Sequence, residues 1–259
     1  LQPVGWDPVM NDSSVERRPP AVVCTIPTWN EAGNILPLVQ ELLALGPGFE
    51  VLVIDDNSPD GTWRLVAEEA ARNPRVHLLH RTTDKGRGRA GRAGFVRALE
   101  MQPRIVIEMD ADFSHHPRYI PTMIRALNAD PKLGLVLGSR AIQGGRDADR
   151  GGLRRIITLC ANLYIRLLLG VPVRDCNSGF RAWRASTLQA IKVDQTFSVG
   201  PAIVQELLYK TARARIGIAE VPIVFEDRKV GESSLTLRLL LQGYTTVLKL
   251  RWLGLIGRI

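Results

Sequence analysis

Short apolar runs alternate with longer segments of mixed polarity over the first 140 residues. Five runs rich in Val, Ile and Leu, each with the length of a buried strand, lie at residues 21–26, 50–55, 75–80, 104–109 and 133–138. The longer segments between them are compatible with helices. Strands that alternate with helices in this way predict an α/β fold, with a mostly parallel sheet and helices on both faces.

The pattern changes after Arg140, where a polar Gly-rich loop leads into an apolar helical segment at 153–170. A further helical segment, a strand-like segment at 216–225 and a final apolar helix follow. Residues 1–20 are polar and interrupted by prolines, without the apolar core of a signal peptide. We therefore expect a flexible arm over 1–20, one domain over 21–234 and an amphipathic helix over 235–259.

The net charge indicates classes of binding partner, and the cysteine spacing indicates the redox compartment. The chain has 34 Lys and Arg against 26 Asp and Glu, a formal net charge of +8. This excess favours polyanionic partners, which include nucleic acid, phosphorylated small molecules and an anionic membrane surface. The three cysteines lack CxxC spacing, so we interpret them as free thiols in a reducing compartment.

Polar clusters follow four of the expected strands. They read TIPTWNE (25–31), DDNSPDG (55–61), DADFSHH (110–116) and GSR (138–140). Each cluster alone is also an ordinary turn or helix cap. Because ligands bind outside the carboxyl ends of strands in an open parallel sheet, four such clusters together predict one functional crevice.

Asp110 and Asp112 are separated by one residue, so in extended chain both carboxylates leave the same face. Together they could hold one hard cation, Mg²⁺ or Mn²⁺, that shares its other positions with water and a substrate diphosphate. The alternative is an ion pair with one of the many arginines. His115 and His116 are expected to pack or cap rather than to bind the metal.

Six segments carry a resemblance to a known family. They are PTWNE (27–31), VIDDNSPDGT (53–62), MDADFSHHP (109–117), GSR (138–140), DCNSGFR (175–181) and EVPIVFEDRKVGESS (220–234). In this order they resemble the motifs of the inverting family 2 glycosyltransferases that include dolichyl-phosphate mannose synthase. The resemblance covers about residues 21–235. It implies a GT-A, Rossmann-like fold, a GDP-mannose donor, a divalent metal and a polyprenyl (dolichyl) phosphate acceptor.

The resemblance also implies roles for individual residues. The donor would be bound by Pro27, Trp29, Glu31, Ile54, Asp56, Asp110, Ala111, Asp112 and Ser114. The acceptor phosphate would be bound by Arg140, Arg154, Thr158 and Arg228. Among these, Asp112, Arg140 and Arg228 are the expected catalytic residues, and Asp110 and Asp112 the metal ligands.

Three departures from the family pattern involve four positions. Arg87 and Arg89 stand where small or apolar residues are usual, and we interpret them as solvated helix charges in preference to donor-phosphate ligands. Ser234 stands where the family has a lysine. Asp175 lies where related transferases place a base, but a phosphate monoester is already largely dianionic at neutral pH and needs none. We treat Asp175 as structural.

Two helices indicate contact with a membrane surface. Arg155, Thr158, Asn162 and Arg166 form one polar stripe, and Arg238, Gln242, Thr245 and Lys249 form another. The charge-free run 239–248 is shorter than the ~20 residues that span a bilayer. We expect interfacial helices and peripheral association with the cytoplasmic face of a membrane; ordinary core helices are the alternative.

Two other functions compete with mannose transfer. A polyprenyl-phosphate glucosyltransferase that uses UDP-glucose would have the same motifs. A non-catalytic nucleic-acid-binding domain would fit the basic charge, but aromatic residues make up only 6% of the chain and the acidic crevice would repel a phosphate backbone. We therefore expect no nucleic-acid partner.

Overall fold

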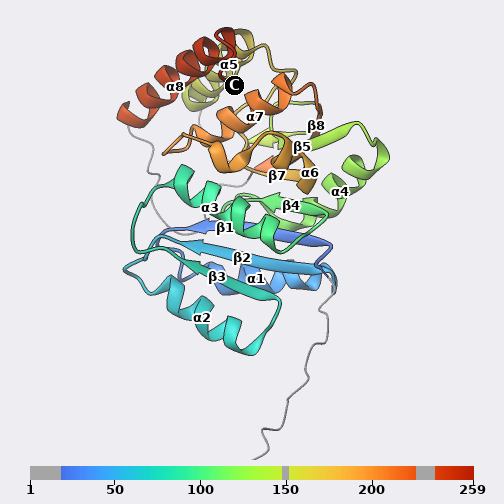
Figure 1. Cartoon of the computed structure of the whole chain (residues 1–259), viewed down its shortest axis with the longest axis vertical. Helices are drawn as coiled ribbons and strands as arrows, with labels where there is room; N and C mark the ends of the chain where they lie inside the picture. Colours follow the sequence, from blue (N-terminus) through green and yellow to red (C-terminus); the bar gives the residue numbers. More distant parts are fainter. Residues whose placement is uncertain (1–18, 148–151, 226–236) are drawn as a thin grey trace, which may run out of the picture.

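The computed structural model describes residues 19–147, 152–225 and 237–259. Figure 1 shows a central sheet with helices packed around it and two long helices, α5 and α8, together at one end. The arm expected over 1–20 lies almost entirely outside the described residues. So do Arg228, Ser234 and the boundary expected near residue 235.

Seven strands form the main sheet in the spatial order β3-β2-β1-β4-β7-β5-β8. They are β1 (Val22–Thr28), β2 (Phe49–Asp55), β3 (Val76–His80), β4 (Ile105–Glu108), β5 (Leu133–Ser139), β7 (Arg181–Arg184) and β8 (Gly217–Pro222). A separate parallel pair consists of β6 (Arg146–Asp147) and β9 (Val224–Phe225). All neighbours in the main sheet are parallel except those of β7, so the expected mostly parallel sheet is confirmed.

The helices lie between the strands as the alternating pattern predicts. They are α1 (Ile35–Ala44), α2 (Thr62–Arg72), α3 (Arg87–Glu100), α4 (Ile120–Ala129), α5 (Gly152–Leu169), α6 (Ala185–Ala190), α7 (Ile203–Arg213) and α8 (Leu237–Leu255). Two short 3₁₀ helices, η1 (Pro117–Tyr119) and η2 (Val193–Gln195), complete the described elements.

Successive strand residues enter two different cores. Val23 and Leu52 pack on one side of the sheet with residues of α3, α5, α7 and α8, whereas Val22 and Val51 pack on the other side with α1 and α4. Because side chains alternate along a strand, burial on both sides requires the continuous apolar runs seen in the sequence. Helices on both faces are thus confirmed.

Strand β7 was not anticipated. Its four residues, Arg-Ala-Trp-Arg, are not an apolar run, yet Arg181 and Trp183 are both fully buried. The strand inserts antiparallel between β4 and β5, and Glu108 of β4 lies directly opposite Arg181. The local sequence does not predict this strand, because the burial of Arg181 depends on Glu108, which lies more than 70 residues away in the sequence.

Helices α5 and α8 lie side by side (Figure 1). Tyr164 of α5 donates its hydroxyl proton to the carbonyl of Tyr244 in α8 at 3.3 Å, and their rings are 5.0 Å apart. All three cysteines are free, as predicted. No helix within the described ranges is long and apolar enough to cross a membrane.

Candidate active site

The loops after β1 and β2 are joined by hydrogen bonds at the carboxyl ends of their strands. Thr28 Oγ1 donates to Asp55 Oδ2 at 2.8 Å, and the amide of Asn30 donates to Ser58 Oγ at 3.1 Å. The amide of Glu31 donates to Thr62 Oγ1 at 3.0 Å. Two of the four predicted clusters therefore form one wall, and we call residues 27–31, 55–62 and 110–114 the strand-end crevice.

Asp56 connects this wall to the start of α3. Its carboxylate accepts from Arg81 Nη1 at 2.6 Å and from the amide of Gly86 at 2.7 Å. Gly86 has a φ of 131°, a conformation that glycine adopts without strain. Asp56 thus positions the loop from which Arg87 extends.

The other residues expected around the donor differ in exposure. Trp29 is 53% exposed at the rim, with Lys85 Nζ 5.4 Å from the centre of its ring. Pro27 is half-buried, and Glu31 accepts from the side chain of Asn34 at 2.9 Å. Ile54 is fully buried in the core, so only its backbone can face the crevice.

Asp110 and Asp112 follow β4 at the centre of the crevice. Asp112 is buried, and its Oδ1 accepts from the amide and the hydroxyl of Ser114 at 3.1 and 2.6 Å. Asp110 is more open, with 36% of its side chain exposed. Ala111 between them is buried. The structure thus brings both carboxylates and Ser114 together, with Asp112 buried and bonded to Ser114 and Asp110 partly exposed.

Arg87 corrects one prediction. It is not a solvated helix charge, because its Nη2 lies 2.7 Å from Asp110 Oδ1 and only 27% of its side chain is exposed. Burial alone would lower the pKa of Arg87, but the surrounding carboxylates, Asp110 foremost, raise it. Arg89 does lie at the surface, 38% exposed and 2.8 Å from Asp84. Helical periodicity could not separate these two arginines, because the partner of Arg87 lies in the loop after β4, distant in the sequence.

Both histidines have the packing and capping roles predicted for them. His115 is buried, stacks on Phe180 with ring centres 5.2 Å apart, and accepts from the amide of Asp110 at 3.1 Å. Burial lowers the pKa of His115, so the ring is neutral when its Nδ1 accepts this bond. His116 caps η1 by accepting from the amide of Arg118 at 3.3 Å.

Arg140 and Asp175 form a buried bidentate ion pair. Arg140 Nε and Nη2 lie 2.8 and 2.9 Å from the two carboxylate oxygens of Asp175, and the guanidinium lies 4.9 Å from the centre of the Phe225 ring. Burial would raise the pKa of Asp175, but its bonds with Arg140 lower it below the usual value. This arrangement is compatible with the structural role expected for Asp175, and Arg140 can offer a ligand only its remaining donors.

The rest of the expected acceptor set is less fully described. Thr158 lies on α5 and is half-buried. Arg154 lies in the first turn of the same helix, and Arg228 is outside the described residues. Of these four residues, Arg140 and Thr158 are the two whose side chains are described.

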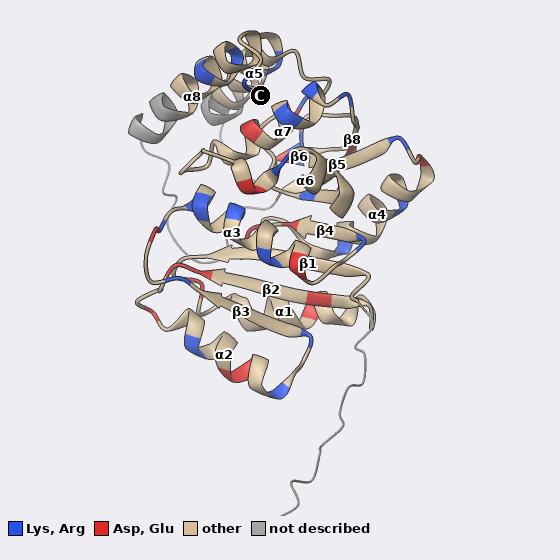
Figure 2. Cartoon of the chain, viewed as in Figure 1, with Lys and Arg blue, Asp and Glu red and all other residues tan. Residues whose placement is uncertain are grey.

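Helices α5 and α8 expose apolar side chains on their outer faces. Leu159, Leu163 and Leu167 of α5 are 59%, 55% and 74% exposed, and Trp252 and Leu255 of α8 are 57% and 70% exposed. Meanwhile Asn162 of α5 is buried. Figure 2 shows basic but no acidic residues on the described parts of both helices. Both helices thus carry apolar residues on the exposed face as well as on the core face, where Ile165, Leu169, Val247 and Leu250 are buried.

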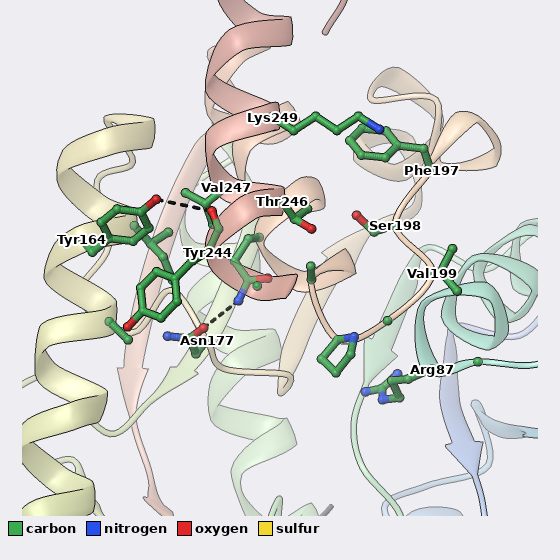
Figure 3. Close-up of a pocket in the computed structure, with 18 residues that line it drawn as sticks. Arg87, Tyr164, Asn177, Phe197, Ser198, Val199, Tyr244, Thr246, Val247 and Lys249 are labelled. Atoms are coloured by element: carbon green, nitrogen blue, oxygen red, sulfur yellow. Dashed lines mark hydrogen bonds between the residues drawn. The ribbon is translucent and has the colours of Figure 1, made fainter. Parts of the chain in front are cut away.

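A cavity of about 670 Å³ lies between α5, α8 and the loop of residues 197–202. We call it the α5–α8 cavity; Figure 3 shows Tyr164 and Tyr244 at one side and Arg87 at the other. Asn177 and Gln205 also line it, and Gln205 Nε2 donates to Asn177 Oδ1 at 2.6 Å. The sequence pattern did not point to this cavity, because its walls come from five separate segments that have no shared motif.

A mostly parallel sheet covered on both faces, with a carboxylate pair after a central strand, defines the GT-A class of glycosyltransferase fold. Comparison with solved structures agrees. Glucosyl-3-phosphoglycerate synthase from Mycobacterium tuberculosis, solved with Mn²⁺, UDP-glucose and phosphoglyceric acid, superimposes with a TM-score of 0.66 at 21% identity. The match covers 90% of this chain and 80% of that one, and it shows the fold.

The sequence itself places the chain within a family. The model of glycosyl transferase family 2 matches residues 24–191, and the chain belongs to that family. It is 38% identical to an undecaprenyl-phosphate mannosyltransferase from Micrococcus luteus, over 92% of this chain and 98% of the relative. It is 35% identical to a polyprenol monophosphomannose synthase from Mycolicibacterium smegmatis, over 87% and 84% of the two chains. Family membership favours an enzyme over a non-catalytic nucleic-acid-binding domain.

Proposed function

We propose that this glycosyltransferase transfers mannose from GDP-mannose to a polyprenyl (dolichyl) phosphate, with inversion at the anomeric carbon. The observation that most strongly supports this proposal is the similarity of nearly the whole chain to an undecaprenyl-phosphate mannosyltransferase. The geometry agrees with such a pair of substrates. A polar crevice suited to a sugar nucleotide adjoins helices whose outer faces are apolar and basic.

The donor diphosphate would lie at Asp110 and Asp112. Their carboxylate oxygens have the chemistry that Mg²⁺ or Mn²⁺ requires, and 36% of the Asp110 side chain is exposed. The described residues contain no group of three or more His, Cys, Asp or Glu side chains able to hold a metal ion. Two carboxylates fit an ion that completes its shell with water and the diphosphate. When bound, such an ion supplies positive charge to the leaving group.

The acceptor would react without a general base. A phosphate monoester is largely dianionic at neutral pH, so one of its oxygens can attack the anomeric carbon directly. As the new bond forms between carbon and this oxygen, the bond to GDP breaks and its electron pair leaves with the diphosphate. Arg140, Arg154, Thr158 and Arg228 are the proposed acceptor-phosphate ligands, with Asp175 fixing the orientation of Arg140.

The outer faces of α5 and α8 would rest on the membrane that holds the acceptor. Exposed leucines and Trp252 can enter the interface between headgroups and acyl chains, while basic residues contact anionic headgroups. Free cysteines suit a reducing compartment, which supports the cytoplasmic face of that membrane.

A transfer assay tests the proposal. Purified protein would be incubated with labelled GDP-mannose or UDP-glucose, a short polyprenyl phosphate and Mg²⁺ or Mn²⁺, with a chelator in a parallel sample. We expect label from GDP-mannose in the lipid fraction and none after chelation. If only the label of UDP-glucose reached the lipid fraction, the enzyme would be a glucosyltransferase. If neither donor labelled the lipid fraction, the proposal would be contradicted.

A further inference from the structure

The guanidinium of Arg87 lies at one end of the strand-end crevice. Strands β2, β1, β4 and β7 are neighbours in that order, so the loops at their ends follow one another along the crevice. The loops 55–62 and 27–31 follow β2 and β1, Asp110 follows β4, and Gly179 comes just before the antiparallel β7. A Cβ at Gly179 would lie 3.7 Å from Asp110 Oδ2 and 3.8 Å from Arg87 Nη2. The guanidinium therefore lies at the β4–β7 end of the crevice, beyond the wall that the β1 and β2 loops form.

The backbone on both sides of Arg87 is held by hydrogen bonds. The amide of Gly86 donates to Asp56 Oδ2 at 2.7 Å, and the amide of Gly88 donates to the carbonyl of Val199 at 2.8 Å. The side chain thus starts from a fixed point at the first turn of α3. A ligand that binds a group held in this way loses little affinity to conformational entropy.

Arg87 is charged and partly accessible beside the carboxylate pair. Burial alone would lower its pKa, but the carboxylates of Asp110, Glu108 and Asp112 raise it. Its Nη2 lies 2.7 Å from Asp110 Oδ1, and 27% of the Arg87 side chain and 36% of the Asp110 side chain are exposed. Each terminal nitrogen of a guanidinium carries two N–H groups, so Nη2 can bind Asp110 and one more acceptor.

The charges around the pair leave a place for such a cation. One divalent ion neutralises the carboxylates of Asp110 and Asp112, but it leaves the charge of the donor diphosphate uncompensated. Further negative charge develops on the phosphate that leaves the sugar, and a fixed positive group beside it lowers the barrier. Arg140 is already held in its buried ion pair, and Arg181 is fully buried. Arg87, in contrast, contacts Asp110 itself and stays partly accessible.

We infer that Arg87 binds the phosphate that carries the sugar, which becomes the terminal phosphate of the departing GDP. The nucleoside lies against the wall of the β1 and β2 loops, so the phosphate farther from it reaches the β4–β7 end of the crevice. As the bond between the anomeric carbon and the phosphate oxygen breaks, its electron pair stays on that oxygen, and Arg87 stabilises the charge. The inference rests on the proposed function and adds to it a catalytic residue that lies outside all six family-like segments.

Binding of GDP and GMP tests this role without any transfer reaction. GMP lacks the terminal phosphate, so the ratio of the two affinities reports the contact with that phosphate. In calorimetry on the full chain with Mg²⁺, Arg87→Leu should weaken GDP binding about ten-fold or more, because one charge-assisted bond is lost. GMP binding should change less than about two-fold. Arg97→Leu breaks an exposed ion pair on the same helix; it is the matched control and should change neither affinity by more than about two-fold.

A second variant separates the charge of Arg87 from its contribution to folding. Arg87→Gln keeps a side-chain amide that can donate to Asp110, but it removes the positive charge. It should keep the melting temperature of the wild type in circular dichroism and show the same selective loss of GDP binding as Arg87→Leu. If Arg87→Leu does not fold, Arg87→Gln alone decides the question.

Three results would overturn the inference. Unchanged GDP binding in a folded variant, or equal losses of GDP and GMP, would show that Arg87 does not bind the terminal phosphate. Tighter GDP binding would mean that Arg87 only competes with the metal ion for Asp110. Transfer of glucose from UDP-glucose in place of mannose would contradict the proposed function alone, and the same comparison with UDP and UMP would then test Arg87.

Discussion

The strand-end crevice and the α5–α8 cavity differ in how their buried polar atoms are satisfied. In the crevice, Thr28, Asp55 and Ser58 bond to one another across two loops. None of the described residues at 27–31 or 55–62 has a buried side-chain nitrogen or oxygen without a partner, whereas three residues of the cavity lining do. The polar groups of the crevice are thus bonded before any ligand binds, whereas these three atoms of the cavity lining are buried without a bond.

This difference indicates two kinds of recognition. A preorganised wall of short loops can hold a rigid, polar sugar nucleotide at little cost in conformational entropy. A cavity between two helices, with mostly apolar walls, suits a ligand with an apolar body. The predictions below test each region and the contacts between them, from the largest expected effect to the smallest.

Asp112→Asn should lower transfer by about 10²–10³-fold, because one carboxylate is lost from the proposed cation and diphosphate site. The fold should persist, since the Asn oxygen can still accept the two bonds from Ser114. Initial rates with Mn²⁺, together with thermal melting by circular dichroism, check both parts. Ser114→Ala is the control for the turn alone. Unchanged activity, or wild-type activity that a chelator does not affect, would exclude the carboxylate pair as the metal site.

Asp175→Asn should destabilise the fold by about 3–5 kcal/mol, because it leaves the buried Arg140 guanidinium without its counter-charge. Urea unfolding measures the change. Glu100→Gln breaks an exposed ion pair with Arg97 and should cost no more than about 0.5 kcal/mol. If the two variants lose equal stability, the buried Arg140–Asp175 pair stabilises the fold no more than an exposed ion pair does.

The same variant predicts a pH dependence. Because Arg140 lowers the pKa of folded Asp175, the stabilisation from this carboxylate is present above its unfolded pKa of about 3.9 and is lost as pH falls further. The difference between wild type and Asp175→Asn should therefore stay constant from about pH 5 to 7 and shrink below about pH 4. A difference that grows on acidification would have the wrong sign.

Replacing Leu159, Leu163 and Leu167 by Ser should weaken binding to anionic vesicles by about ten-fold or more. The reason is that three apolar side chains would no longer be transferred from water into the membrane interface. Flotation with phosphatidylglycerol vesicles measures it. None of these three leucines lines the α5–α8 cavity, so its walls stay in place. Trp29→Ser removes an equally exposed apolar residue from the crevice rim and should have no effect. Equal binding of the two variants would argue against an interfacial α5.

Trp29→Ala should weaken binding of the sugar nucleotide by about five-fold, the loss of one stacking contact worth about 1 kcal/mol. Calorimetry with GDP-mannose and Mg²⁺ measures it, and prenyl phosphate binding should not change. Lys85→Met keeps the ring and removes the cation above it, so its expected effect is below about two-fold. An equal effect on both ligands would mean that Trp29 does not belong to the donor site alone.

The departures from expectation concern mainly residues whose partners lie far away in sequence. Arg87 and Arg89 look alike in a helix pattern, but only Arg87 meets Asp110 of another element. Arg140 was expected to be available to a phosphate, and its two donors bound by Asp175 become apparent only when residues 35 positions apart are brought together. The residue type alone therefore does not show whether an arginine side chain is solvated, forms an ion pair or can bind a ligand.

The sequence by itself determined the parallel sheet, the helices on both faces and the polar clusters at the strand ends. These features follow from period, strand length and turn chemistry, which act over a few neighbouring residues. Only the tertiary structure decided the insertion of β7, the partner of Arg87 and the α5–α8 cavity. Each of these depends on burial, because the cost of leaving a charge or a polar group without a partner arises only after distant segments exclude water around it.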